Sequence, residues 1–169
     1  MAAAILGWTT AAQAAGNAVG IGGKTSLSAI AAINTTNPDV GEDTTTLLLG
    51  GTAAYTTPDA RFEFGGGLTV SGFFSDFADI AVWTVSGQAR VNSNALGPEE
   101  NVILYGGASA GVSIITGDFE DELAVFGPKL GAEFYVSPNA AIQIENSLLF
   151  GSDSSVTNTL TIGFKILFN

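Results

Sequence analysis

The sequence predicts an all-β fold, namely a closed, eight-stranded, antiparallel up-and-down β-barrel that spans a membrane. Three observations lead to this prediction. Apolar and polar residues alternate strictly in the closing part of the chain, the apolar content is high without any long apolar run, and the less apolar face carries small and charged residues. Alternation with a period of two indicates strands, because successive side chains of a strand point to opposite faces.

Composition favours a membrane barrel over both a soluble domain and a membrane helix. Of the 169 residues, 46% are hydrophobic and only 12% are charged. A typical soluble domain has about 25% charged residues. No stretch supplies the roughly 20 consecutive apolar residues that a membrane helix needs. In a transmembrane barrel half of the strand residues face lipid and half face the lumen, which gives apolar content without apolar runs.

In chain order, an N-terminal segment precedes the predicted barrel. Residues 1–15 are alanine-rich, and we interpret them as a truncated signal peptide or a short N-terminal helix. The barrel domain occupies residues 16–169, and its alternation begins at Gly16. The first predicted strand places Ile21 on the apolar face and ends at a polar loop at residues 34–43, which contains Pro and Gly.

Seven further strands follow, separated by turn and loop sequences. A Pro-Asp type of turn at residues 57–60 joins the second and third strands. The alternation is imperfect at two places, the run Leu47-Leu48-Leu49 and the pair Ile80 and Val82. The seven predicted strands are at residues 44–55, 61–74, 80–91, 102–115, 124–136, 141–150 and 159–168. An even number of strands lets both termini lie on one side of the barrel.

The charged residues within the strands indicate which face is inside. A water-facing surface would carry many more charges, so we favour a membrane barrel over a soluble barrel with its apolar face inward. Buried charges are tolerable when they are paired, and we therefore expect a lumenal ion-pair network. It comprises all five basic residues and three glutamates, which share the less apolar face: Lys24, Arg61, Glu63, Arg90, Lys129, Glu133, Glu145 and Lys165.

Within this network we expect one cluster across the seam where the last strand meets the first. It contains Glu133, Glu145, Lys165 and Lys24, with Lys129 as a nearby partner. The interior of an eight-stranded barrel is only just wide enough for its side chains, so such a cluster would plug the lumen. Glycines on the same face argue against a fully plugged lumen, because they leave room for water.

Aromatic residues follow the apolar register, several of them near strand ends, where membrane barrels carry aromatic girdles. The predicted lipid-facing aromatics are Phe62, Phe64, Phe74, Trp83, Phe126, Phe134, Phe150, Phe164 and Phe168.

Acidic residues gather in the predicted loops instead. The loop at residues 116–122 is a weak candidate for a divalent cation, because hard cations prefer oxygen ligands. A solvated acidic loop is the simpler interpretation, and we expect no other metal and no cofactor. The candidate ligands are Asp118, Glu120, Asp121 and Glu122.

The closing part of the chain resembles small outer-membrane barrels of the opacity-protein and OmpA type. Residues 127–145 and 159–168 contain a glycine-containing strand, a short Pro-Asn turn, an acidic strand and a last strand that ends in an aromatic residue. The resemblance implies a Gram-negative outer membrane and a periplasmic C-terminus. Outer-membrane lipid and lipopolysaccharide are then the expected partners, with divalent cations bridging the external acidic loops to lipopolysaccharide. We expect a monomer.

Composition also narrows the function. The chain has no histidine, which removes the usual general base of hydrolytic triads, and its net charge of −11 argues against nucleic acid as a partner. We therefore expect a non-enzymatic protein with a structural or surface-interaction role and a partly plugged lumen. The alternative is a narrow porin-like channel for small solutes, and a lipid-modifying enzyme is a third class. The short external loops argue against a large adhesive surface.

Overall fold

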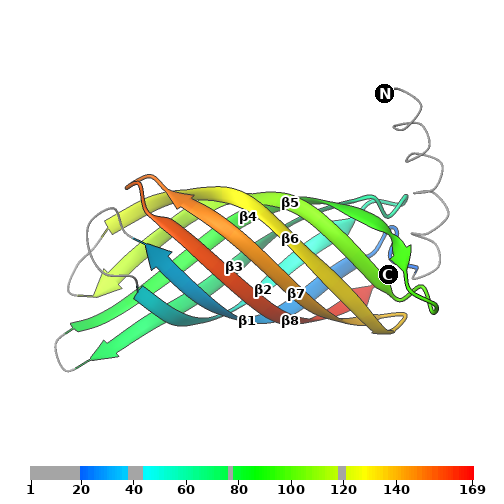
Figure 1. Cartoon of the computed structure of the whole chain (residues 1–169), viewed down its shortest axis with the longest axis horizontal. Helices are drawn as coiled ribbons and strands as arrows, with labels where there is room; N and C mark the ends of the chain where they lie inside the picture. Colours follow the sequence, from blue (N-terminus) through cyan, green and yellow to red (C-terminus); the bar gives the residue numbers. More distant parts are fainter. Residues whose placement is uncertain (1–19, 38–43, 76–77, 118–120) are drawn as a thin grey trace.

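Eight antiparallel strands follow one another around a closed barrel in sequence order (Figure 1). The computed structural model describes residues 20–37, 44–75, 78–117 and 121–169. The predicted fold class is confirmed. The strands are β1 (Thr25–Asn37), β2 (Thr44–Thr56), β3 (Phe62–Ser75), β4 (Ala78–Leu96), β5 (Val102–Gly117), β6 (Asp121–Ser137), β7 (Ala140–Gly151) and β8 (Val156–Phe168).

Pairing of the first strand with the last closes the barrel. Thr25 of β1 lies opposite Phe168 of β8, and the ladder runs on to Asn37 opposite Val156. Because all neighbouring strands are antiparallel, β1 begins and β8 ends at the same end of the barrel, which we call the terminus end. The connection between β7 and β8 lies at the opposite end, which we call the loop end.

The outer wall is apolar and the inner wall is polar. In β8, Leu160 and Ile162 are 48% and 56% exposed, whereas Thr161 and Lys165 are 6% and 1% exposed. Large apolar side chains of all eight strands are exposed in the same way. This arrangement suits a barrel surrounded by lipid and is the reverse of a soluble barrel. Within the described residues, no helix is long and apolar enough to cross a membrane.

The chain enters the barrel later than predicted. β1 begins at Thr25, while residues 1–19, which include the predicted N-terminal segment, lie outside the described residues. Gly20 and Gly23 have φ values of 64° and 74°, a backbone conformation that favours glycine, and they turn the chain before β1. Ile21, predicted on the lipid-facing side, is instead 1% exposed at the mouth of the barrel.

Several predicted loops are partly strand, and the largest differences are at residues 34–43 and 92–101. β1 continues to Asn37, and β4 continues to Leu96 through an irregularity in its pairing between Asn92 and Ala95. Both segments are rich in polar residues, which suggested loops. In a barrel with a polar lumen, however, inward-facing strand positions also accept polar side chains. Asn92 is buried, and its Nδ2 donates to the carbonyl of Ala60 over 3.0 Å.

Candidate functional site

The lumen is the candidate functional site, and it divides along the barrel axis into three parts. An apolar cap lies at the terminus end, an ion-pair layer follows it, and a pocket occupies the loop-end half. The order follows from the strand register, because inward positions alternate along each strand. On β8, for example, Leu167 belongs to the cap, Lys165 to the ion-pair layer and Thr161 to the pocket wall.

The apolar cap closes the terminus end. Ile21 comes from the turn before β1, and Ala60 comes from the turn between β2 and β3. Ile21, Ile103 and Ala141 are at most 1% exposed. The cap is therefore one apolar cluster with residues from two turns and four strands. Its members are Ile21, Ala60, Ile103, Tyr135, Ala141 and Leu167.

Four charges of alternating sign form the centre of the ion-pair layer. Arg90 Nη2 lies 2.9 Å from Glu63 Oε2 and 2.5 Å from Glu133 Oε1. Lys165 Nζ lies 2.6 Å and 2.9 Å from the same two oxygens. These side chains are at most 4% exposed. They come from β3, β4, β6 and β8. Arg90 and Glu63 lie opposite each other on neighbouring strands, whereas the other three pairs join strands that are not neighbours and so reach across the lumen.

Neutral donors add to the hydrogen bonding of the two central carboxylates. Tyr135 Oη donates to Glu133 Oε2 over 2.6 Å, and Thr56 Oγ1 donates to Glu63 Oε2 over 3.0 Å. A buried ion pair offsets its desolvation cost only when its geometry is good and the remaining polar atoms are satisfied. These hydroxyls add one hydrogen bond to each glutamate, whereas Nε of Arg90 is buried without a partner among the described residues.

A second ion pair extends the layer towards the loop end. Lys129 Nζ lies 2.8 Å from Glu145 Oε2 and also donates to Gln88 Oε1. Lys129 is 4% exposed and Glu145 is 9% exposed. With this pair the layer contains three acids and three bases, so its formal charge is −3 + 3 = 0.

Tyr105 connects the two groups of charges. Its hydroxyl donates to Glu145 Oε2 over 3.0 Å, and its ring lies under the Arg90 guanidinium, with Cζ 4.0 Å from the ring centroid. Cations are attracted to the face of an aromatic ring. Gly131 makes room for this ring, because an added Cβ would overlap the Tyr105 hydroxyl and come within 2.7 Å of the Ile144 carbonyl oxygen.

The structure therefore brings six of the eight predicted network residues together, but the pairing differs from the expected seam cluster. Glu145 pairs with Lys129 and not with Lys165, which instead pairs with Glu63 and Glu133. The prediction considered neighbouring strands, whereas in a narrow barrel the long side chains meet across the interior. Glu63 of β3 reaches Lys165 of β8 in this way.

Lys24 and Arg61 lie outside the ion-pair layer, which corrects the prediction for both. Lys24 Nζ donates to Asn139 Oδ1 over 2.8 Å and to the Pro138 carbonyl over 3.4 Å, at the turn between β6 and β7. Arg61 lies in the turn before β3, with its guanidinium 6.0 Å from the Phe62 ring centroid. Both residues precede the first residue of a strand, so the inward register of that strand does not apply to them.

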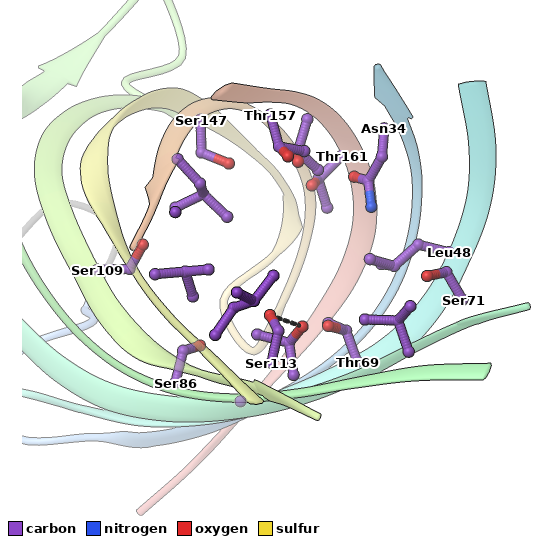
Figure 2. A pocket seen from close by; sticks show the side chains of 18 of the residues that line it. Asn34, Leu48, Thr69, Ser71, Ser86, Ser109, Ser113, Ser147, Thr157 and Thr161 are labelled. Atoms are coloured by element: carbon purple, nitrogen blue, oxygen red, sulfur yellow. Dashed lines mark hydrogen bonds between the residues drawn. The ribbon is translucent and has the colours of Figure 1, made fainter. Parts of the chain in front are cut away.

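A pocket of about 400 Å³ occupies the loop-end half of the lumen. Lys129, Glu145 and Gln88 lie at its deep end, and Asp153 and Ser155 of the β7–β8 loop lie at its shallow end. Figure 2 shows hydroxyl side chains from several strands pointing into this space, and the dashed line marks the 2.8 Å hydrogen bond between Thr84 Oγ1 and Ser113 Oγ.

The pocket wall also carries aliphatic side chains, which explains the two places where the alternation of the sequence is imperfect. Leu48, the middle residue of the three consecutive leucines, is 8% exposed and lines the pocket, whereas Leu47 and Leu49 are 64% and 56% exposed on the outer wall. Val82 also lines the pocket. The inner wall is therefore apolar at these positions, unlike the polar lumen of a water-filled barrel.

Acidic side chains surround the loop end. Asp121 and Glu122 at the start of β6 are exposed. The Ser155 hydroxyl donates to Asp153 over 2.6 Å, which lowers the pKa of that carboxyl below its usual value. Two of the four candidate metal ligands, Asp118 and Glu120, lie outside the described residues. In the described part of the chain no three metal-binding side chains cluster, and the cation site stays a prediction.

The predicted lipid-facing aromatics occupy the outer wall wherever their side chains are described. Phe126 and Phe150, on neighbouring strands, have ring centroids 5.9 Å apart. The side chain of Phe74 lies outside the described residues. The exposed fractions run from 36% for Phe150 to 58% for Phe126 in the group Phe62, Phe64, Trp83, Phe126, Phe134, Phe150, Phe164 and Phe168.

Comparison with known proteins identifies the type of fold. No protein-family model matches the sequence, and no curated protein matches it. Among solved structures, neisserial surface protein A is similar, with a TM-score of 0.72 and 15% identity over 85% of this chain and 97% of that one. The fold is that of a small outer-membrane β-barrel.

Two further solved structures are similar. Ail, the attachment invasion locus protein of Yersinia pestis, has a TM-score of 0.62 and 16% identity over 87% of this chain and 99% of its own. OprG from Pseudomonas aeruginosa has a TM-score of 0.61 and 11% identity over 88% of this chain and 97% of its own. The resemblance to small outer-membrane barrels is confirmed at the level of the fold. The apolar outer wall fits a barrel of this fold surrounded by membrane lipid.

Several residues of the lumen were not predicted from the sequence. Tyr105 and Tyr135 hydrogen-bond to the buried glutamates, and Gln88 accepts from Lys129. Both tyrosines lie on the less apolar register, among glycine, serine and charged residues, where a large ring is unusual. The presence of these two tyrosines on the less apolar face could have indicated that they belong to the lumen. The sequence does not say which charged side chain each tyrosine would contact.

Proposed function

We propose that this chain is a non-enzymatic outer-membrane barrel with a structural or surface-interaction role and a lumen closed to ion flow. One observation carries the proposal: Arg90 and Lys165 each bridge Glu63 and Glu133 across the lumen. The apolar cap beneath these charges narrows the same end of the lumen but carries no charged group, so we assign the barrier to ion flow to the ion-pair layer.

The energetic cost of opening supports a permanently closed state. Removing one partner from a buried ion pair typically costs about 3–5 kcal/mol, because the other charge is left unpaired. A conducting path through this layer would separate several such pairs. The absence of histidine from the sequence agrees with a role that involves no general acid–base chemistry.

The charge of the loop end bears on possible surface partners. Ail has been crystallised with the heparin analogue sucrose octasulfate. In the present chain Asp121, Glu122 and Asp153 are near the loop end and the net charge is −11, so a polyanion would be repelled. We expect lipopolysaccharide phosphates to contact this end through divalent cations, with the loop end facing outward.

Planar-bilayer conductance of the purified protein tests the closed lumen. The double variant Arg90→Ala/Lys165→Ala removes both bridging cations, and Lys24→Ala/Arg61→Ala removes the same two residue types outside the layer. We expect the parent protein and the second variant to give no steady conductance, and the first variant to give small, steady channels.

The competing role is a narrow porin-like channel, which the loop-end pocket favours because it already hollows half of the lumen. That role predicts steady channels from the parent protein, with a conductance that rises with salt concentration. Such channels in most insertions of correctly folded protein would overturn the closed lumen. Heat-modifiable migration on a gel verifies the folding of each variant before the measurement.

A further inference from the structure

The loop-end pocket has features that neither a structural barrel nor a closed lumen requires. It measures about 400 Å³, which lies within the range of about 300–1,000 Å³ typical of small-molecule sites. Its wall comprises residues of all eight strands, so the barrel scaffold itself holds the space open.

The wall changes character with depth. Near the deep end it carries Gln88, Ser109, Ser147 and Thr161, next to the Lys129–Glu145 ion pair. Towards the loop end it carries aliphatic residues on β2 and on β4–β7, and polar residues such as Asn34 and Thr46 on the remaining side. The strand registers place several of these close together: Leu48 and Val82 both lie opposite Ser71, and Val82 lies opposite Ile115. The aliphatic part of the wall includes Leu48, Val82, Ile115, Leu123, Val125 and Leu149.

Charge limits what this space accepts. The deep end is neutral overall, because Lys129 and Glu145 pair with each other over 2.8 Å. The shallow end carries the Asp153 carboxylate, with exposed Asp121 and Glu122 on β6. An anion approaching from the loop end therefore meets like charge and finds no unpaired cation at the deep end.

One polar atom of the wall lacks a partner. Asn34 Oδ1 is buried and accepts no hydrogen bond from the described residues, and Figure 2 shows Asn34 among the side chains that line the pocket. Leaving a buried acceptor unsatisfied costs about 1–3 kcal/mol. A ligand that donates a hydrogen bond to this oxygen, after rotation of the Asn34 amide towards the pocket, would remove this cost.

We propose that the loop-end half of the lumen binds an uncharged amphiphile, a molecule with an aliphatic body and a hydroxyl or amide end. The aliphatic body contacts Leu48, Val82 and the neighbouring aliphatic residues, while the polar end hydrogen-bonds to the hydroxyl and amide side chains of the wall. This site does not depend on conduction past the four central charges, because the Lys129–Glu145 pair forms its deep end and the central charges lie beyond that pair.

A thiol-protection experiment tests the site at a single position. The sequence contains no cysteine, so Ser147→Cys places one thiol in the pocket wall and Ser137→Cys places one at the exposed last residue of β6, at the terminus end. Each variant is placed in phosphatidylcholine nanodiscs and treated with methyl methanethiosulfonate, alone or with n-decanol or n-decanoate. The labelled fraction is followed over time by mass spectrometry.

We expect n-decanol to slow labelling at Ser147→Cys by about tenfold when it is present at roughly ten times its dissociation constant, since protection follows 1 + [L]/Kd. Labelling at Ser137→Cys should not change, and n-decanoate should protect the pocket thiol far less. Adding Leu48→Asn to Ser147→Cys should weaken the protection, because it replaces aliphatic wall with an amide.

Three outcomes would overturn the proposal. Unchanged labelling of Ser147→Cys in n-decanol would show that the pocket does not bind this class of molecule. Equal slowing of both thiols would show a general effect of the alcohol on the bilayer. Equal protection by n-decanoate would show that the site does not select an uncharged ligand. Bilayer conductance is a separate measurement, so the failure of the closed lumen and the failure of this site are distinguishable.

Discussion

The two halves of the lumen are built on the same strands and yet have opposite character. Towards the terminus end, every charged side chain of the ion-pair layer has a partner, and an apolar cluster covers the layer. Towards the loop end, hydroxyl and aliphatic side chains line an open pocket. The difference arises from side-chain length, because long charged and aromatic side chains reach across the barrel whereas serine and threonine do not.

The two halves of the lumen therefore differ in what their side chains can do. Pairs that cross the lumen tie non-neighbouring strands together, as Lys165 of β8 and Glu63 of β3 do. Short side chains leave space that a ligand can fill. The first half therefore contributes to stability, and the second half is available for binding.

The largest effect is expected from removing the carboxylate shared by both bridging cations. Glu133→Ala leaves Arg90 and Lys165 with Glu63 alone and also deprives the Tyr135 hydroxyl of its acceptor. We expect the free energy of unfolding in lipid vesicles, measured with urea, to fall by about 3–5 kcal/mol. Ser147→Ala in the pocket wall is the matched change and should cost less than about 1 kcal/mol. Equal losses in the two variants would contradict the contrast between the halves.

The next effect concerns the premise that the polar face is the inner face. Leu130 is 69% exposed on the outer wall of β6. Leu130→Arg should lower the free energy of unfolding in lipid by about 2–4 kcal/mol, the cost of a basic side chain at the middle of a bilayer. Leu130→Met is the control and should change little. If Leu130→Arg left stability unchanged, the outer wall would not be in contact with lipid.

A smaller effect is expected from crowding Tyr105. Gly131→Ala places a Cβ against the tyrosine hydroxyl and should displace the ring from Glu145 and Arg90. Overpacking of this kind typically costs about 1–3 kcal/mol. Gly87→Ala is the control, because its added Cβ would meet no atom nearer than 4.0 Å. Urea unfolding should show a lower free energy of unfolding for Gly131→Ala than for Gly87→Ala. Equal free energies of unfolding would mean that Tyr105 can move aside without loss of stability.

The smallest effect belongs to the pocket wall. Ser113→Ala removes the hydrogen bond to Thr84 Oγ1 and should cost about 0.5–1.5 kcal/mol. Ser86→Ala also changes a pocket-lining hydroxyl and should cost less, since it has no hydrogen bond to another side chain in the described structure. A loss as large as that of Glu133→Ala would mean that the loop-end half also holds the barrel together.

Much of the fold was predictable because the signal is local. Alternation along each strand gave the eight strands and their lipid-facing residues, such as Phe126 and Phe164, which are exposed on the outer wall. Strand ends were predicted less well. Polar residues at Asn34 and Asn92 suggested loops, but both positions lie within strands, since a lumen tolerates polar side chains.

The candidate site was predictable in composition but not in pairing. The sequence placed Glu63, Arg90 and Lys165 on one face, and it placed Lys24 and Arg61 there too. Which charges meet depends on the tilt of the strands and on the width of the barrel, and neither property is visible in the spacing of residues along one strand. Lys24 lies between the turn at Gly20 and Gly23 and the start of β1, and its side chain reaches Asn139 instead of the ion-pair layer.

By itself, the sequence determined that this chain forms a membrane barrel whose inner face carries the polar positions of the strands, because the period of two and the scarcity of charges are properties of neighbouring residues. Only the tertiary structure decided that Lys165 joins Glu63 across the lumen and that Leu48 and Val82 turn inward to line a pocket. Those contacts join residues from distant strands. They exist because the closed barrel brings opposite walls within the length of a side chain.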